Sequence, residues 1–420
     1  MTSEAAPTRA YVWVWLPGAT EPVVAGVLEA SGDIIYFNYG RSYLARPEAV
    51  PLYSPELPLQ AGRLRPLGGL HVAGCIRDAA PDAWGQRVIL HRLLGRVTRD
   101  TDPAELSLLT YLLESGSDRI GALDFQSSPD TYVPRSARGT LEEMVQAAAR
   151  LEAGEPFSPE LDAALLRGSS IGGARPKVLL DDGDRKLIAK FSSRTDLYPV
   201  VKAESAAMAL ARRIGLDVAP TELIECLGHD VLLVERFDRT STPRERRMVV
   251  SALTILQLDE MMARYATYHE LADVVRARFT RPKDALRELF SRIVFNICVG
   301  NTDDHARNHA AFWDGSQLGL TPAYDICPQA RTGGEAAQAM EIGRDGFRRP
   351  QLAGCVRAAE TYLLTPSEAE EIIDHQLDVI HTQWSDAADV ARLTEAERLA
   401  LWGRQILNPF VLQGYRSHPA

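Results

Sequence analysis

The stretch GNTDDHARNHAAFWDGSQLGLTPAYDI, residues 300–326, decides how the rest of the sequence is interpreted. It begins with a glycine that can end the apolar helix expected over residues 282–299. The apolar run AAFW then leads into Asp314 and Gly315, a strong signal for a short hairpin. Such a hairpin would bring Asp325 back towards Asn308, so that both side chains could bind one magnesium ion through oxygen.

The spacing within this loop indicates a reaction. Asp303 precedes Asn308 by five residues, as do the Asp and Asn of the catalytic loop of protein kinases, where the carboxylate meets the substrate hydroxyl and the amide oxygen binds magnesium. His305 and His309 fall four apart, but no glutamate follows the first histidine and no third zinc ligand is evident. We expect His305 to orient the loop through hydrogen bonds. A solvated polar loop is the simpler alternative, although the apolar strand before Asp325 argues against it.

A second chemical segment is GSSIGGARPKVLLDDGDRKLIAKF, residues 168–191, in which a Gly-rich loop is followed by a strand, a tight turn and a strand. Gly172 and Gly173 would let the backbone approach phosphates closely, although such turns are more often only turns. Lys190 is flanked by apolar residues, and Glu204 lies near the start of the next predicted helix, residues 200–214. A strand lysine paired with a helical glutamate anchors phosphates in protein kinases, but a chance surface pair has the same spacing.

The segment VLLVERFDR, residues 231–239, ends a hydrophobic strand with charged and aromatic residues. It would suit the connection between two lobes, where adenine binds through backbone hydrogen bonds. An ordinary strand end is the alternative. The residues at this strand end are Glu235, Arg236, Phe237 and Asp238.

The composition is that of an ordinary globular chain, with 420 residues, 45% of them hydrophobic and 24% charged. Two or three packed units are therefore expected. The net charge of −10 gives a field that repels nucleic-acid phosphates and argues against autonomous DNA binding. Arg244, Arg246 and Arg247 could form a local basic face, although a solvated loop is the simpler interpretation.

Targeting and redox signals are weak in this sequence. The first ten residues have no basic start and apolar run, and no stretch is apolar over the ~18 residues that a membrane span requires. The cysteines are odd in number and never form C-x-x-C, which disfavours zinc and disulfide frameworks. They are Cys75, Cys226, Cys298, Cys327 and Cys355. We expect a reducing, cytoplasmic location and no membrane partner.

The remaining chain suggests how the units are arranged. Strand-like runs over residues 11–16 and 33–39 alternate with Pro and Gly, which indicates a small β unit. Helical spacing follows over residues 70–115, in which Trp84, Val88, Leu90 and Leu94 recur at mixed helical spacings and Gly116 is a plausible stop. Most of the C-terminal part is expected to be helical. Its predicted capping boxes are Ser367 with Glu370 and Thr394 with Glu397.

Several motifs in this order resemble the HipA-type serine/threonine kinases. They are SSIGGARPK, the strand lysine, VERFDR, GNTDDHARNH and PAYDI, together with YFNYGRSYL, PLYSPELPL, RDAAPDAWGQR and DRIGALDF nearer the N-terminus. The resemblance implies an α+β fold: a protein-kinase-like two-lobe fold with an extra small N-terminal β subdomain and a mostly helical C-terminal lobe. The expected boundaries are residues 1–120 for the N-terminal subdomain, 140–240 for the ATP-binding lobe and 241–420 for the helical lobe.

The resemblance also implies roles for individual residues. Asp303 would be the catalytic base, aided by His305, and Asn308 and Asp325 would bind Mg²⁺. Glu235 and Phe237 would form the adenine-side hinge and Asp238 would reach the ribose. Ser170 matches the position of autophosphorylation, where added charge would oppose ATP binding. The ATP-binding set expected from motif and resemblance together is Ser170, Ile171, Gly172, Gly173, Lys177, Lys190, Glu204, Glu235, Phe237, Asp238 and Asn308.

The implied partners are those of a toxin. Such proteins phosphorylate a translation protein such as an aminoacyl-tRNA synthetase, and a small HipB-like helix-turn-helix antitoxin holds them inactive. DNA contact would then be indirect, through the antitoxin. Two alternatives stay open: a kinase acting on small molecules, and a catalytically weak nucleotide-binding co-repressor subunit.

Overall fold

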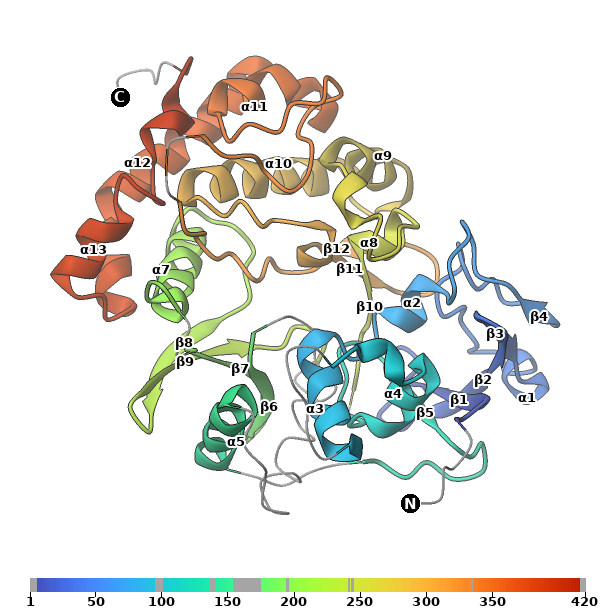
Figure 1. Cartoon of the computed structure of the whole chain (residues 1–420). Coiled ribbons are helices and arrows are strands. Elements are labelled where there is room, and N and C mark those ends of the chain that lie inside the picture. The colour runs from blue at the N-terminus through green and yellow to red at the C-terminus, as the bar shows by residue number, and fades with distance from the viewer. Residues whose placement is uncertain are drawn as a thin grey trace. The chain divides into compact units, whose positions relative to one another are not determined.

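The computed structural model describes residues 6–94, 101–135, 140–153, 175–193, 196–240, 242, 245–331, 333 and 335–415. The chain forms two compact units, each built from separated stretches of sequence (Figure 1). The first unit contains Met1–Ser193, Glu225–Val250 and Trp313–Ser316. The second unit contains Arg194–Ile224, Ser251–Phe312 and Gln317–Ala420. This division cuts across the three predicted segments, whose boundaries stay a prediction.

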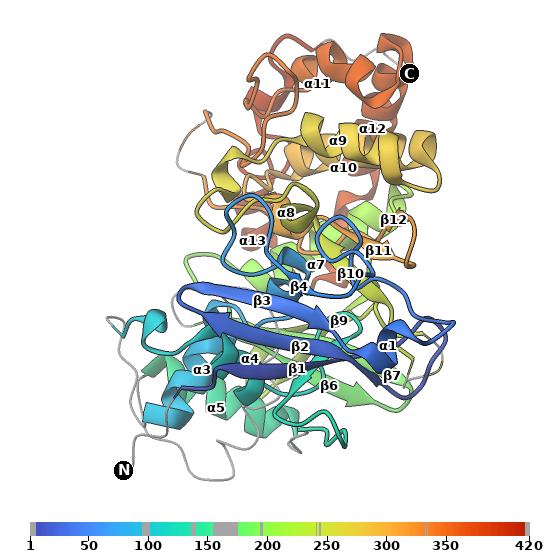
Figure 2. The same cartoon turned by 90° about the vertical axis from the view of Figure 1, so that its right-hand side faces the viewer.

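The first unit begins with a five-stranded antiparallel sheet in the order β4-β3-β2-β1-β5. Figure 2 shows β1, β2 and β3 side by side. Gly26 has no room for a side chain, because a Cβ there would lie 2.0 Å from the Asn38 carbonyl oxygen. The predicted small β unit is therefore present. Its strands are β1 (Arg9–Val14), β2 (Val23–Ser31), β3 (Ile34–Tyr39), β4 (Arg63–Leu64) and β5 (Leu123–Gln126).

Helices α2, α3 and α4 lie between β4 and β5 in the sequence, within the region where the spacing predicts helices. All four residues of the helical pattern lie in α3, where Trp84, Val88 and Leu90 are buried and Leu94, the last residue of the helix, is 48% exposed. The fourth helix ends at Glu114, two residues before the predicted stop at Gly116. The helices of this region are α1 (Arg41–Leu44), α2 (Gly74–Arg77), α3 (Ala83–Leu94), η1 (Pro103–Glu105), α4 (Leu108–Glu114) and α5 (Leu141–Ala153).

A second antiparallel sheet carries the predicted phosphate-anchoring strand. In it β7 (Arg185–Phe191) lies between β6 (Lys177–Asp182) and β9 (His229–Glu235). Gly183, with φ of +58°, supplies the tight turn between β6 and β7. Two further strands, β8 (Thr221–Cys226) and β10 (Met248–Ser251), carry the chain from one unit to the other.

The second unit is mostly helical and is organised around α10 (Pro282–Val299). Leu289, Ile293 and Val294 of this helix are fully buried, and α9, α11 and α12 pack against it (Figure 1). The elements before α10 are α7 (Val200–Arg213), α8 (Ala252–Ile255), η3 (Ala263–Tyr265) and α9 (Tyr268–Arg278). Those after it are η4 (Ala306–Asn308), β11 (Ala310–Trp313), β12 (Leu318–Leu320), α11 (Leu352–Ala358), η5 (Ala359–Tyr362), α12 (Pro366–Val390), α13 (Glu395–Leu401) and η6 (Pro409–Leu412).

One of the two predicted capping boxes is wrong by two residues. The box that starts α12 is Thr365 with Glu368 rather than Ser367 with Glu370, while the box of Thr394 and Glu397 is confirmed at α13. The shift follows from Pro366, which occupies the first helical position because it has no N–H to lose there. The cap must then be the residue before the proline.

The sequence also led to expectations about membrane spans, the cysteines and a basic face. Across the described ranges, none of the helices combines the length and the apolar character needed to cross a membrane. All five cysteines are free thiols, and four of them are buried. Arg246 does not form a basic face, because its guanidinium lies 3.5 Å above the Trp15 ring and donates to the Ser117 carbonyl oxygen.

Candidate active site

The loop that follows α10 leaves the helix at a fixed angle. Gly300 ends α10 in the left-handed conformation, with φ of +72°, as the sequence predicts. A Cβ at this position would lie 2.6 Å from the Gln405 carbonyl oxygen, so only glycine fits. The next residue, Asn301, is buried and donates from Nδ2 to Oδ1 of Asn296 at 3.0 Å. The Gln338 side chain in turn donates to the Asn301 carbonyl oxygen at 3.1 Å.

The two adjacent aspartates of the loop lie in opposite environments. Asp303 is exposed, whereas Asp304 is 3% exposed. Asp304 Oδ2 accepts hydrogen bonds from the Tyr268 hydroxyl, from Asn296 Nδ2 at 2.7 Å and from His309 Nε2 at 3.0 Å. The sequence offers no local signal for this role of Asp304, because its donors Tyr268 and Asn296 lie 36 and 8 positions away along the chain.

The hairpin returns the segment of Asp325, a predicted Mg²⁺ ligand, to the loop of the predicted base Asp303, because the Tyr324 hydroxyl donates to the Arg307 carbonyl oxygen. Partial removal from water raises the pKa of Asp303; the neighbouring His305 lowers it, and the carboxylates of Asp325 and Asp304 raise it further, with a net rise. Asn308 completes the group, because its Nδ2 donates to the Asp303 carbonyl oxygen at 3.3 Å.

Asp325 is held in an uncommon backbone conformation. Its φ of +60° is in the left-handed region, which Asp tolerates better than most residues. The preceding residues are fixed: the Tyr324 hydroxyl donates to the Arg307 carbonyl oxygen at 2.7 Å, and the Ala323 N–H donates to the Asp217 carbonyl oxygen at 2.7 Å. Residues in such conformations cluster at functional sites, where the surrounding structure holds them.

The two histidines of the loop differ in their hydrogen bonds. His305 Nδ1 is buried and has no hydrogen-bond partner among the described residues, so the predicted orienting hydrogen bonds through His305 are wrong for this nitrogen. His309 instead holds the loop through Asp304. Within the described ranges, no group of three or more His, Cys, Asp or Glu side chains is arranged to hold a metal ion.

Arg307, the arginine of the loop, forms an ion pair with Glu260. Arg307 donates from Nε to one carboxylate oxygen of Glu260 at 3.0 Å and from Nη2 to the other. This two-point contact fixes the orientation of the guanidinium. Arg307 therefore ties the loop to the segment after α8.

The predicted phosphate-binding residues that are described lie in the first unit. Lys190 is in β7, directly opposite Lys177 in β6, and both are buried, at 7% and 8% exposed. Directly opposite residues of an antiparallel pair have their side chains on the same face. Two ammonium groups thus share one face of this sheet. Glu204 is buried on α7 in the second unit.

The segment after β9 is held by an arginine and aspartate cluster. Asp238, 1% exposed, accepts from Arg236 at 3.0 and 2.8 Å, from Arg239 at 2.6 Å and from the Gly121 N–H at 2.7 Å. Both arginines also donate to Asp118, which lies just before β5. Because the Asp238 carboxylate is buried and has these partners, this geometry does not favour the predicted contact with a ribose. We call Asp118, Arg236, Asp238 and Arg239 the hinge cluster.

The other predicted nucleotide residues are placed as follows. Glu235 ends β9 with its side chain 41% exposed and 3.7 Å from Arg185, and Phe237 is half-buried. The predicted residues Ser170, Ile171, Gly172 and Gly173 lie outside the described residues. Their roles stay a prediction.

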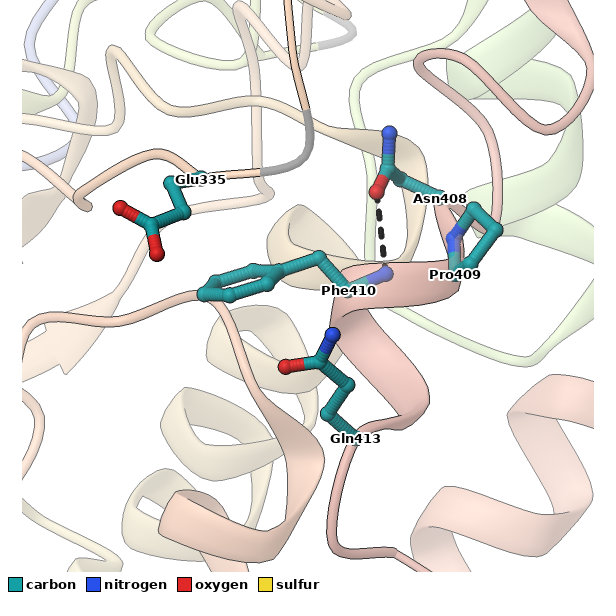
Figure 3. A pocket seen from close by; sticks show the side chains of 5 residues that line it. All are labelled: Glu335, Asn408, Pro409, Phe410 and Gln413. Atoms are coloured by element: carbon teal, nitrogen blue, oxygen red, sulfur yellow. Dashed lines mark hydrogen bonds between the residues drawn. The ribbon is translucent and has the colours of Figure 1, made fainter.

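A pocket of about 450 Å³ in the second unit contains none of these residues (Figure 3). Its lining is Glu335, Asn408, Pro409, Phe410 and Gln413. Asn408 Oδ1 accepts from the Phe410 N–H at 3.0 Å, which caps η6. With a single carboxylate and no second titratable group, this pocket lacks the acid and base pair that catalysis would need.

Two family models match the chain. Residues 14–126 match the model of the HipA N-terminal domain, and residues 169–384 match that of the HipA-like C-terminal domain. A protein of Sinorhizobium fredii named as a candidate kinase, Y4mE, is 30% identical over 325 residues, which cover 70% of this chain and 72% of that protein.

Two comparisons lead to Shewanella oneidensis. Its serine/threonine-protein kinase toxin HipA is 25% identical over 186 residues, 37% of this chain and 42% of that protein. A chain in the structure of its HipA, HipB and operator DNA complex matches with a TM-score of 0.68 and 20% identity, over 96% of this chain and 97% of that chain. At this identity the structural match shows the fold, which is the predicted α+β kinase-like fold.

Proposed function

The chain belongs to the HipA family, and we propose that it is an ATP- and Mg²⁺-dependent serine/threonine protein kinase. The observation that carries the proposal is the grouping of Asp303, Asn308 and Asp325 in one loop region. The Asp325 carboxylate and the Asn308 amide offer the oxygen donors that magnesium prefers. The raised pKa of Asp303 supports the same conclusion, since a cation would relieve the repulsion between its carboxylate and that of Asp325.

Different residues of the chain have different roles in the proposed reaction. Asn308 and Asp325 would hold Mg²⁺, which when bound neutralises charge on the phosphate oxygens. Asp303 orients the hydroxyl of the substrate serine or threonine and accepts its proton as the oxygen bonds to the γ-phosphorus. The bond from that phosphorus to the β-phosphate oxygen breaks, and ADP leaves. Lys177 and Lys190 supply positive charge for the phosphates, and Glu204 is the proposed partner of Lys190.

The biological role that we propose is that of a toxin. The substrate would be a protein of translation such as an aminoacyl-tRNA synthetase, and a HipB-like helix-turn-helix antitoxin would hold the enzyme inactive and carry any DNA contact. The family membership and the fold shared with a chain of the Shewanella complex support this proposal. Autophosphorylation at Ser170 is part of it, and the reaction would take place in the cytoplasm.

The proposal is tested with purified protein, γ-labelled ATP, Mg²⁺ and a cell extract depleted of small molecules. We expect label in a protein, in Ser170 or both, and its loss in Asp303→Ala. The matched control is Asp284→Ala, which removes a carboxylate that is 72% exposed in the same unit. Equal labelling by both variants would refute the assignment of Asp303. Label that appears only in added sugars or antibiotics would favour the small-molecule kinase.

A further inference from the structure

The strongest unassigned feature of the second unit is the buried carboxylate beside the predicted base. Asp304 is 3% exposed, although an ionised carboxylate is costly to remove from water. Its Oδ2 accepts from Tyr268, Asn296 and His309, which satisfies the charge with hydrogen bonds. We call these four residues the anchor cluster. Nothing in the proposed chemistry uses their side chains directly.

The anchor cluster draws on three separate elements. Tyr268 begins α9, Asn296 is in the last turns of α10, and His309 immediately precedes β11. Asp304 lies in the loop between Asn296 and His309. The carboxylate therefore fastens the loop to two helices and to the start of a strand at one point.

The same contacts fix both ends of the segment that contains Asp303 and Asn308. At the second end, the His309 carbonyl oxygen accepts from the Ala252 N–H at 2.7 Å, and its ring meets that of Tyr268 edge-on at 5.6 Å. Since a carboxylate only accepts, His309 Nε2 carries the proton in this hydrogen bond. Within the segment, the His305 N–H donates to the Asp303 carbonyl oxygen at 2.9 Å, and the Asn308 N–H donates to that of His305 at 2.8 Å.

We infer that Tyr268, Asp304 and His309 are positioning residues for the phosphoryl-transfer step. They act through the backbone: the buried carboxylate sets where its exposed neighbour Asp303 and the amide of Asn308 lie. Catalysis requires such groups to be held to within a fraction of an ångström, and residues behind the reacting groups usually do this. The inference rests on the proposed kinase function, but its central claim, the order of the loop, is measurable without activity.

The first test compares two tyrosine variants. Tyr268→Phe removes the hydroxyl that donates to Asp304, and the control Tyr362→Phe removes an equally buried hydroxyl that donates to the Ile342 carbonyl oxygen at 2.8 Å, outside the anchor cluster. Hydrogen exchange followed by mass spectrometry then reports on residues 300–310. We expect Tyr268→Phe to speed exchange there by roughly tenfold to a hundredfold, the range for a lost hydrogen bond to a charged group. Unchanged exchange in this peptide would overturn the inference, whether or not the protein is active.

The second test separates positioning from folding. The value of kcat is normalised to the concentration of protein that binds nucleotide. Tyr268→Phe should then lower kcat at least fivefold while KM for ATP stays within twofold, and Tyr362→Phe should leave both unchanged. His309→Gln keeps an N–H that can reach Asp304 and should retain more kcat than His309→Leu, which only fills space. Equal kcat in the wild type and in all these variants would overturn the inference. A wild-type protein that transfers no phosphate would instead overturn the proposed function, and the exchange experiment would still decide the role of the anchor cluster.

Discussion

Replacing Asp238 by Asn should destabilise the first unit strongly. The buried carboxylate accepts hydrogen bonds from Arg236, Arg239 and the Gly121 N–H. An asparagine has one acceptor oxygen, and its NH₂ group would face a guanidinium that can only donate. Two buried cations would then have Asp118 as the remaining carboxylate of the hinge cluster.

The expected change in the free energy of unfolding follows from the loss of one of the two carboxylates beside the arginines. Removing one partner of a buried ion pair costs about 3–5 kcal/mol. Because Asp118 remains beside both arginines, we take the lower end of this range. The free energy of unfolding of the first unit should therefore fall by about 3 kcal/mol at pH 7.

Urea denaturation followed by tryptophan fluorescence measures this change. Trp15 lies under the guanidinium of Arg246 in the same unit and reports on its unfolding. The control is Asp181→Asn, which weakens the ion pair between Asp181 and Lys186. The two groups are 2.7 Å apart, and the Asp181 side chain is 40% exposed. Exposed pairs contribute about 0–1 kcal/mol. Equal losses in the two variants would refute the reasoning about burial.

The difference between wild type and Asp238→Asn should also depend on pH. Burial alone would raise the pKa of Asp238, but Arg236 and Arg239 outweigh it and hold this pKa below its ordinary value. A carboxyl group with a lowered folded-state pKa adds stability above its unfolded-state pKa, about 3.9, and loses it as the pH falls through the folded-state pKa. The difference should thus be complete at pH 7 and shrink below about pH 4. A difference that widens in acid would contradict this sign.

Three further outcomes are expected. Lys190→Ala should reduce kcat/KM for ATP at least about tenfold, whereas Lys186→Ala in the same strand should change it less than about twofold, as steady-state kinetics would measure. Gly300→Ala should lower the free energy of unfolding by about 1–3 kcal/mol in urea, because its Cβ would meet the Gln405 carbonyl oxygen and φ is +72°. Asp325→Asn should weaken Mg²⁺-dependent phosphoryl transfer at least about tenfold with little change in the urea midpoint, since Asn also tolerates a left-handed backbone.

Features set by a few neighbouring residues could be predicted from the sequence. Gly300 as the end of α10 and the tight turn before the strand of Lys190 both depend on local backbone preferences, and both are present. The hairpin is also present: β11 and β12 are neighbours, and the Thr321 N–H donates to the Ala310 carbonyl oxygen. The approach of Asp325 to Asp303 follows from that turn.

Features set by distant residues could not be predicted. Arg236 and Asp118 are 118 positions apart, and no local pattern in either segment indicates their ion pair. Asp303 and Asp304 are chemically identical neighbours, so only the donors Tyr268 and Asn296 around Asp304 distinguish the buried one from the exposed one. For these residues, partner and burial are properties of the tertiary fold.

The way the first unit is assembled has a consequence for protein synthesis. Residues 313–316 belong to it, and Trp313 donates from Nε1 to the Pro51 carbonyl oxygen at 2.8 Å and meets the Tyr53 ring edge-on at 5.4 Å. Domains generally fold in the order in which they leave the ribosome. Here the N-terminal part must wait until most of the polypeptide has been translated before this indole can reach it. A nascent chain halted before residue 313 would therefore carry an unfinished first unit, open to chaperones and proteases.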